Sequence, residues 1–185
     1  MKSSIHHLLR NGLPYGIIAG LLIVIVRAAV YLFNVNQTNV SFAVFNFVYN
    51  AVVLFLCLYL GTLAYRKKNK DGNLSFGQGL VSCIWIGFIT IFIIYAYDLI
   101  FYYFIVPDYL SNMFDPQIAA VSNSTAIPAE QKIKLIETLD RYKSPLYMSS
   151  INALMSLGIS MVISLITALF TIKKRPVIEL MSNDA

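Results

Sequence analysis

The sequence predicts an all-α integral membrane protein with four transmembrane helices. Of its 185 residues, 58% are hydrophobic and only 12% are charged, whereas soluble domains are about a quarter charged. The mean hydropathy is +0.69. In addition, long stretches of the chain contain no charged residue, and these stretches place the spans.

This composition excludes a cytosolic enzyme, a disordered regulator and a disulfide-stapled secreted module. A soluble chain of this length has too small an interior to bury so much apolar surface, and the exposed remainder would drive aggregation. The first partner expected is therefore the lipid bilayer. The net charge of +5 is explained by basic flanks facing anionic lipid, so a nucleic-acid partner has no separate support.

Four charge-free stretches define the spans. They are Asn11–Val26, Ala28–Tyr65, Gly72–Tyr97 and Ser144–Ile172. The second stretch is too long for one crossing, because roughly 20 helical residues cross a bilayer core, and the polar run Asn34–Asn39 divides it. We expect one four-span domain over residues 1–185, with an outer loop over 107–148. The expected spans are Leu13–Phe33, Val40–Ala64, Gly77–Val106 and Ser149–Ile172.

The third span has clear signals at both ends. Ser75 and Gln78 form an S-x-x-Q capping box, in which each side chain accepts a hydrogen bond from the backbone N–H of the other residue. Pro107 cannot continue a helix and marks the other end.

The placement of lysine and arginine predicts the orientation. One side of the predicted bundle carries nine cations, and the other carries four, all in the long loop; Arg27 lies inside a span. The nine are Lys2, Arg10, Arg66, Lys67, Lys68, Lys70, Lys173, Lys174 and Arg175. The positive-inside rule then puts both termini of this multi-pass chain in the cytoplasm.

The outer loop predicts one amphipathic helix. Residues 111–127 are expected to be irregular, with Asp115-Pro116 and the run Ser122–Thr125 as helix breakers. From Pro128 to Tyr142, apolar residues recur at helical spacing, and Glu130–Lys134 and Glu137–Arg141 form i,i+4 pairs. This helix either caps the bundle as a lid or belongs to a receptor-like or substrate-binding loop.

The whole pattern resembles a known family. The features are four spans, a basic loop running into Leu74-Ser75-Phe76-Gly77-Gln78-Gly79-Leu80, a long outer loop with a charged helix, and a last span ending in Lys173-Lys174-Arg175. Together they resemble the bacterial domain-of-unknown-function family 4199. The resemblance implies a small integral protein of the bacterial inner membrane whose role is uncharacterised, and it supplies no functional residues.

Arg27 and Asp98 are ionisable residues inside spans, which cost about 2.5 to 3.5 kcal/mol at the bilayer centre. Both are expected roughly 10 to 14 Å from the outer boundary, a depth that permits an ion pair. Arg27 can alternatively extend to the headgroups. Asp98 is either paired with Arg27, protonated in a polar pocket, or part of an ion or proton site.

Other polar side chains are expected at the same level. They are Asn46 and Asn50 in the second span and Asn152 and Ser156 in the fourth. Interhelical hydrogen bonds between such residues commonly hold membrane helices together. The alternative is an outer pocket floored by Asp98, with Tyr95 and Tyr102 nearby.

The inner half of the bundle offers fewer polar groups for a continuous path. Within the stretches 52–60 and 81–88, the polar or reactive side chains are Cys57, Tyr59, Ser82, Cys83 and Trp85. This composition favours at most a blind outer pocket.

Two stripes of small residues predict close helix packing. Gly12, Gly16 and Gly20 recur every fourth residue in the first span, and Ser156, Ser160, Ser164 and Ala168 do so in the fourth. Such stripes let backbones approach closely. We expect Gly16 and Gly20 to meet Ser164 and Ala168; dimerisation through the first span is the alternative.

No catalytic, cofactor or metal motif occurs in the sequence. We therefore expect no enzyme activity, no cofactor and no metal. The favoured function is a non-enzymatic accessory or assembly protein, with a membrane-protein partner or a homo-oligomer. The alternative is a small-solute, ion or proton pathway around Asp98 and Arg27.

Overall fold

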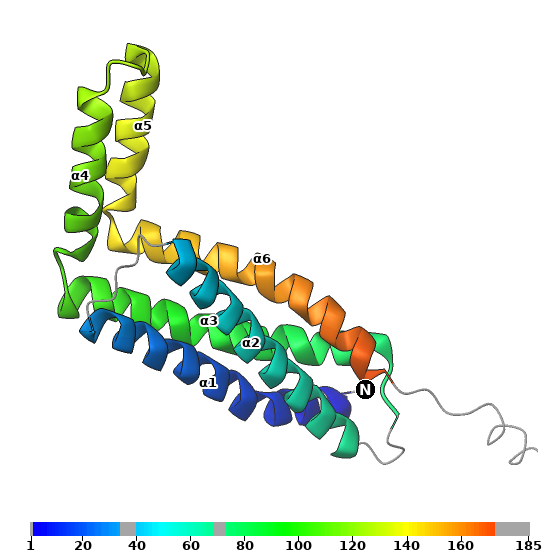
Figure 1. The fold of residues 1–185 in the computed structure, drawn as a ribbon. Helices are drawn as coiled ribbons and strands as arrows, with labels where there is room; N and C mark the ends of the chain where they lie inside the picture. Colours follow the sequence, from blue (N-terminus) through cyan, green and yellow to red (C-terminus); the bar gives the residue numbers. More distant parts are fainter. Residues whose placement is uncertain (1, 34–39, 69–72, 173–185) are drawn as a thin grey trace, which may run out of the picture. The chain divides into compact units, whose positions relative to one another are not determined.

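The structure is a computed structural model that describes residues 2–33, 40–68 and 73–172, with side chains from Arg10 onward. It is all-helical (Figure 1). Its elements are α1 (Lys2–Leu32), α2 (Val40–Lys68), α3 (Phe76–Ile100), the π-helix η1 (Phe101–Ile105), α4 (Tyr109–Asn123), α5 (Ala129–Tyr142) and α6 (Pro145–Thr171). The predicted turn at 34–39 and the cations Lys70, Lys173, Lys174 and Arg175 lie outside the described residues.

Four helices are long and apolar enough to cross a membrane, which confirms the predicted fold class. These candidate spans are Arg10–Leu32, Val40–Lys68, Phe76–Ile105 and Pro145–Thr171. Large apolar side chains are exposed along them; Leu169 and Phe170 of α6, for example, are 64% and 70% exposed. A surface of this kind suits lipid rather than water, and the four spans indicate a multi-pass membrane protein.

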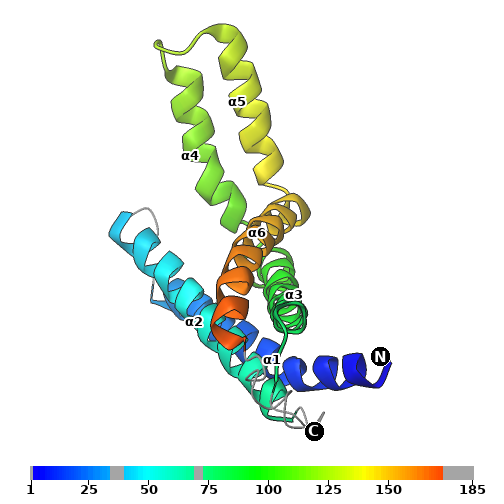
Figure 2. The same ribbon diagram turned by 90° about the vertical axis from the view of Figure 1, so that its right-hand side faces the viewer.

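The chain forms two compact units, which are described separately. The first contains residues 1–93 and 156–185, and the second contains residues 94–155. In the first unit α1 packs against α2, and the Tyr49 hydroxyl donates a 3.1 Å hydrogen bond to the Leu22 carbonyl (Figure 2). The single four-span domain stays a prediction.

The core of the first unit joins all four of its helices. Leu54 and Leu58 of α2 cluster with Cys83 and Ile86 of α3, and each of the four is at most 7% exposed. Tyr15 of α1 and Ile163 of α6 pack against this cluster. Two residues of α3, Cys83 and Ile86, therefore belong to the apolar cluster that the other three helices share.

The predicted capping box begins α3. The Gln78 backbone N–H donates to Ser75 Oγ at 3.3 Å, and the Ser75 N–H donates to Gln78 Oε1 at 3.2 Å. Two of the N–H groups at the start of the helix thus gain acceptors.

Replacing Ser75 by alanine is expected to cost about 1 kcal/mol of unfolding free energy, because the Gln78 amide loses its acceptor. Hydrogen exchange at the Gln78 amide should quicken in the variant. Gln78→Ala removes the other half of the box and should quicken exchange at the Ser75 amide. Gln131→Ala is its matched control, since Gln131 occupies the same position in α5, which has no side-chain cap. Unchanged exchange at Gln78 would show that the capping box does not hold the start of α3.

The third span ends before Pro107, as predicted, but its last turn is a π-helix. The Val106 N–H donates to the Phe101 carbonyl at 2.9 Å, which is the i→i−5 bond of a π-helix. The π-helix begins three residues after Asp98. The sequence pattern gave no sign of it.

The prediction that residues 111–127 are irregular is wrong. Residues 109–123 form the helix α4, and Pro116 lies inside it. Proline removes one backbone hydrogen bond from a helix interior, at a cost of about 3 kcal/mol. Pro116 and Asn112, whose carbonyl loses its donor, both lie on the exposed side of α4, where water can bind that carbonyl. Leu110 and Phe114 are buried on the opposite side and offset the cost.

The charged helix predicted after Pro128 is confirmed as α5. Lys134 pairs with Glu130 at 2.8 Å, and Arg141 pairs with Glu137 at 2.7 Å. The connection between the third and fourth spans therefore holds two helices instead of one, running side by side (Figures 1 and 2). We call this pair the α4–α5 hairpin.

Candidate functional site

The glycine stripe of α1 packs against α3, so its predicted pairing with the last span is wrong. A Cβ atom built on Gly16 would lie 2.8 Å from Ile89 Cβ and 2.9 Å from the Ile86 carbonyl oxygen. A Cβ on Gly20 would lie 2.9 Å from Ile93 Cβ, and one on Gly12 would lie 3.1 Å from Ile86 Cγ1. These distances leave no room for a side chain between α1 and α3.

The small residues of α6 also pack against α3, on glycines of that helix. A Cβ on Gly87 would collide with Ser160 Oγ, and a Cβ on Gly79 would lie 3.3 Å from Thr171 Oγ1 and 3.8 Å from Ala168 Cα. Ser160, Ser164 and Ala168 are all buried. Within the first unit, α3 is thus the helix that both small-residue stripes approach.

Buried hydroxyl groups join the helices of the first unit. Thr90 Oγ1 donates to the Gly16 carbonyl of α1 at 3.2 Å and to the Ile86 carbonyl of its own helix at 2.9 Å. Thr62 Oγ1 of α2 lies 3.5 Å from Ser82 Oγ and 3.2 Å from Cys83 Sγ, both on α3. These groups tie α1 and α2 to α3.

The hydroxyls of α6 bond mainly along their own helix. Thr167 donates to the Ile163 carbonyl at 2.8 Å, and Thr171 donates to the Thr167 and Ala168 carbonyls, each at 3.1 Å. The Ser164 hydroxyl is buried, and no hydrogen-bond partner for it lies among the described residues.

The first unit contains four members of the predicted polar cluster, namely Arg27, Asn46, Asn50 and Ser156, all half-buried. The Asn50 amide donates to the Asn46 carbonyl at 2.7 Å and to Asn46 Oδ1 at 3.1 Å. The Asn50 amide is therefore held by Asn46, one turn earlier on α2.

The second unit contains Asp98 and Asn152, the other members of the predicted polar cluster. Asp98 is only 3% exposed, and Asn152 is half-buried. Phe101 and Tyr102, one turn after Asp98, contact Tyr109 with ring centroids 5.4 and 5.8 Å away. A buried carboxylate thus lies next to an aromatic cluster and the π-helix. The assembly of all six residues into one site stays a prediction.

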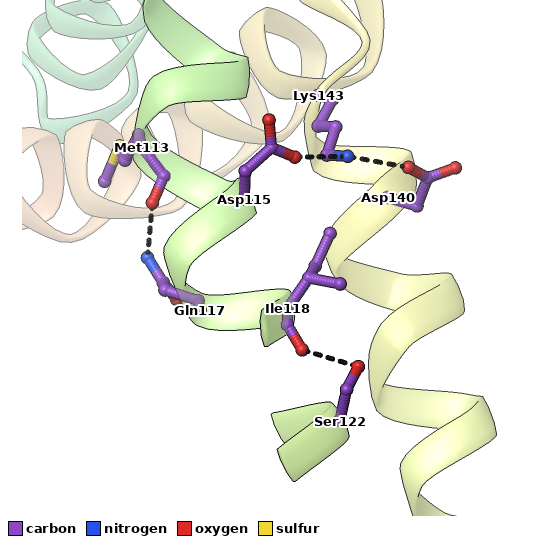
Figure 3. A network of polar contacts seen from close by, with 7 residues as sticks. All are labelled: Met113, Asp115, Gln117, Ile118, Ser122, Asp140 and Lys143. Carbon is purple, nitrogen blue, oxygen red and sulfur yellow. Dashed lines mark hydrogen bonds and ion pairs between the residues drawn. The ribbon is translucent and has the colours of Figure 1, made fainter. Parts of the chain in front are cut away.

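The α4–α5 hairpin carries an ion-pair network of its own (Figure 3). Lys143 Nζ lies 2.7 Å from Asp115 Oδ1 of α4 and 3.1 Å from Asp140 Oδ1 of α5. Beside this network, the Phe114 and Tyr142 rings stack with centroids 5.7 Å apart. Lys132 Nζ of α5 also donates to the Ser122 carbonyl of α4 at 3.1 Å, so two lysines and one aromatic pair join the two helices.

The comparisons with known proteins identify the family. The family described as "Protein of unknown function (DUF4199)" matches residues 14–173, which include the first candidate span from Pro14 onward, the other three spans in full, and the hairpin. The chain belongs to the DUF4199 family. No curated protein and no solved structure matches it.

The sequence analysis missed several buried hydroxyls of this DUF4199 chain. Thr62, Thr90, Thr167 and Thr171 are at most 1% exposed. The expectation of few polar groups in the inner half therefore needs correction, because these threonines lie outside the two stretches on which it depended. For α6 a spacing signal was available, since Thr171 follows Ala168 by three residues and extends the small-residue stripe by one turn.

The described residues of the DUF4199 chain contain no group of three histidine, cysteine or acidic side chains able to hold a metal ion. Cys57 and Cys83 are free and buried. The chemistry that the described side chains offer includes hydrogen bonding between helices, the buried carboxyl group of Asp98 in a candidate span, and the ion pairs of the hairpin.

The hairpin network makes a prediction about pH. Hydrogen bonding to Asp115, and secondly to Asp140, raises the pKa of Lys143 above its ordinary value of 10.5. Because this pKa is higher in the folded chain, the ion pairs stabilise the hairpin fully below the ordinary lysine pKa. Their contribution is lost as the pH rises through the raised value.

Titration of the Lys143 ¹³Cε resonance measures this pKa. Asp115→Asn should lower it more than Asp140→Asn, because Asp115 is the larger cause of the shift. Glu137→Gln serves as the control, since Glu137 pairs with Arg141. An equal titration midpoint in the wild type and in Asp115→Asn would contradict the contact.

Proposed function

We propose that this chain is a non-enzymatic accessory or assembly protein of the bacterial inner membrane, with both termini in the cytoplasm. The observation that supports the proposal most is the use of the buried hydroxyls. Thr90, Thr167 and Thr171 donate to backbone carbonyls, and Thr62 contacts Ser82 and Cys83. The contacts of Thr62 and Thr90 join different helices, whereas those of Thr167 and Thr171 lie within α6. Hydroxyls committed in either way leave little capacity for a substrate.

The α4–α5 hairpin supplies the surface for a partner. The charged side chains of its i,i+4 ion pairs are exposed. The side chains of Glu130 and Lys134, for example, are 82% and 73% exposed. Exposed pairs of this kind contribute little stability, typically below about 1 kcal/mol, so their charges are available for recognition. We propose that another membrane protein, or a second copy of this chain, recognises the hairpin through these charges.

Affinity capture of the full chain from native membranes tests this proposal, with the bound proteins identified by mass spectrometry. A partner should be recovered in near-stoichiometric amount. The matched variant exchanges Glu130→Lys with Lys134→Glu, which keeps the i,i+4 pair and the helix but reverses the surface pattern. We expect the variant to lose the partner. Capture of no protein in near-stoichiometric amount, or equal capture by the variant, would contradict the role assigned to the hairpin.

A small-solute, ion or proton pathway is the second candidate, and Asp98 favours it. A carboxylate that is 3% exposed in a candidate membrane span is costly and marks functional sites in many membrane proteins. The π-helix that follows it is a feature often found at such sites. Proton or solute flux into proteoliposomes that disappears in Asp98→Asn, while the melting temperature is kept, would favour this candidate over the accessory role.

A further inference from the structure

We propose that the basic end of the first unit binds the headgroup of an anionic phospholipid. The basic end is defined by Arg10 of α1 and by Arg66, Lys67 and Lys68 at the end of α2. The proposal concerns a lipid site on the spans and is independent of any partner of the hairpin.

Two hydrogen bonds from the basic end hold three helices together. Arg66 Nη1 donates to the carbonyl of Thr171, the last residue of α6, at 3.3 Å. Lys68 Nζ donates to Asn11 Oδ1 of α1 at 2.8 Å. Arg66 and Lys68 are therefore placed by contacts among α1, α2 and α6 (Figure 1). Cations held in this way lose little side-chain entropy on binding.

The positive charge of this end has no counterpart in the described part of the first unit. Its residues 2–33, 40–68, 73–93 and 156–172 contain no aspartate or glutamate; Asp71, Glu179 and Asp184 lie outside them. Arg10, Lys67 and Lys68 are exposed, and Arg66 is half-buried. Their charge can thus attract an anion from the surroundings, and guanidinium and ammonium groups are the usual protein donors to phosphate oxygens.

The surface beside the cations identifies the anion as a lipid. Leu13, three residues after Arg10, is 45% exposed, and Leu60, six residues before Arg66, is 51% exposed. Phe170, next to the residue that Arg66 binds, is 70% exposed. A ligand with a phosphate headgroup and an acyl chain fits both surfaces, whereas free phosphate would use only the cations.

Native mass spectrometry of the full chain in detergent tests the site, with dioleoylphosphatidylglycerol and dioleoylphosphatidylcholine as probes. The two lipids share their acyl chains and differ in headgroup charge. We expect the wild type to retain the anionic lipid preferentially, and added salt to weaken its retention.

The test variant is Arg10→Gln with Lys67→Gln, because Arg66 and Lys68 also hold helix ends. Affinity for the anionic lipid should fall about fivefold for each cation removed. The charge-conserving variant Arg10→Lys with Lys67→Arg should retain the lipid, which separates loss of charge from loss of fold. Lys132→Gln with Lys134→Gln, on the hairpin, keeps the same net charge as the test variant and should bind the lipid as the wild type does.

Several outcomes would overturn the proposal. They are equal retention of the two lipids, unchanged retention in the test variant, an equal loss in the hairpin control, and a loss in the charge-conserving variant. Competition by inorganic phosphate at equal concentration would identify a free-anion site in place of a lipid site.

Discussion

Leucine in place of Gly16 is expected to lower the free energy of unfolding by about 2 to 3 kcal/mol. Even a Cβ atom at Gly16 would lie 2.9 Å from the Ile86 carbonyl oxygen and 2.8 Å from Ile89 Cβ. Neither atom is the end of a flexible side chain, so α1 and α3 must separate to admit leucine. The separation would also lengthen the 3.2 Å hydrogen bond from Thr90 to the Gly16 carbonyl.

Gly158→Leu is the matched control, because it places the same side chain inside another candidate span. A Cβ at Gly158 meets no atom within 4 Å, and the residue is exposed. Leucine is also a better helix former than glycine, so this variant should be as stable as the wild type or slightly more stable. Chemical unfolding in mixed micelles compares the two variants. Equal losses would contradict the close approach of α1 to α3.

Phe114→Ala is expected to destabilise the α4–α5 hairpin by about 3 to 5 kcal/mol. Phe114 is 7% exposed, and its ring stacks on Tyr142 of α5. A 15-residue helix with an internal proline has little stability of its own, so α4 depends on this packing. Removal of the ring should therefore unfold α4 locally.

Hydrogen exchange measured along the chain distinguishes this local unfolding from global loss of the fold. Amides of α4 should lose protection in Phe114→Ala, whereas amides of the spans should keep it. Met113→Ala is the control, because Met113 is the preceding residue of α4 and is 42% exposed. Full protection of α4 in Phe114→Ala would show that other contacts hold the hairpin.

The spans and their ends were accessible from the sequence because their causes are local. A charge-free apolar run of about 20 residues forms a helix in lipid whatever its neighbours are. The capping box of Ser75 and Gln78 depends only on residues three positions apart, and the ion pairs of α5 depend on residues four apart. The structure confirms each of them.

The helix α4 was missed because its stability is not local. Pro116 argues against a helix, and this signal is correct for an isolated segment. Burial of Leu110 and Phe114 against neighbouring residues outweighs it. Phe114 stacks on Tyr142 of the antiparallel neighbour α5, a contact that a search for helix breakers does not take into account.

The candidate site shows the same division between local and tertiary information. The spacing of Gly12, Gly16 and Gly20 predicts that some helix approaches α1 closely, but spacing alone does not say which one. The partner is set by Ile86, Ile89 and Ile93, which α3 presents at helical spacing. Bonds such as that between Thr90 and Gly16, 74 residues apart, follow only from this choice of neighbour.

Reporter fusions in living cells test the four-span architecture most directly, with the reporter placed after Lys70, at Ser122 and at the C-terminus. Four spans require an even number of crossings between the termini, and the nine cations predict their side. We expect cytoplasmic signals after Lys70 and at the C-terminus, and an external signal at Ser122, at the end of α4. A C-terminal signal from the same side as Ser122 would contradict the fourth span and the predicted cytoplasmic position of both termini.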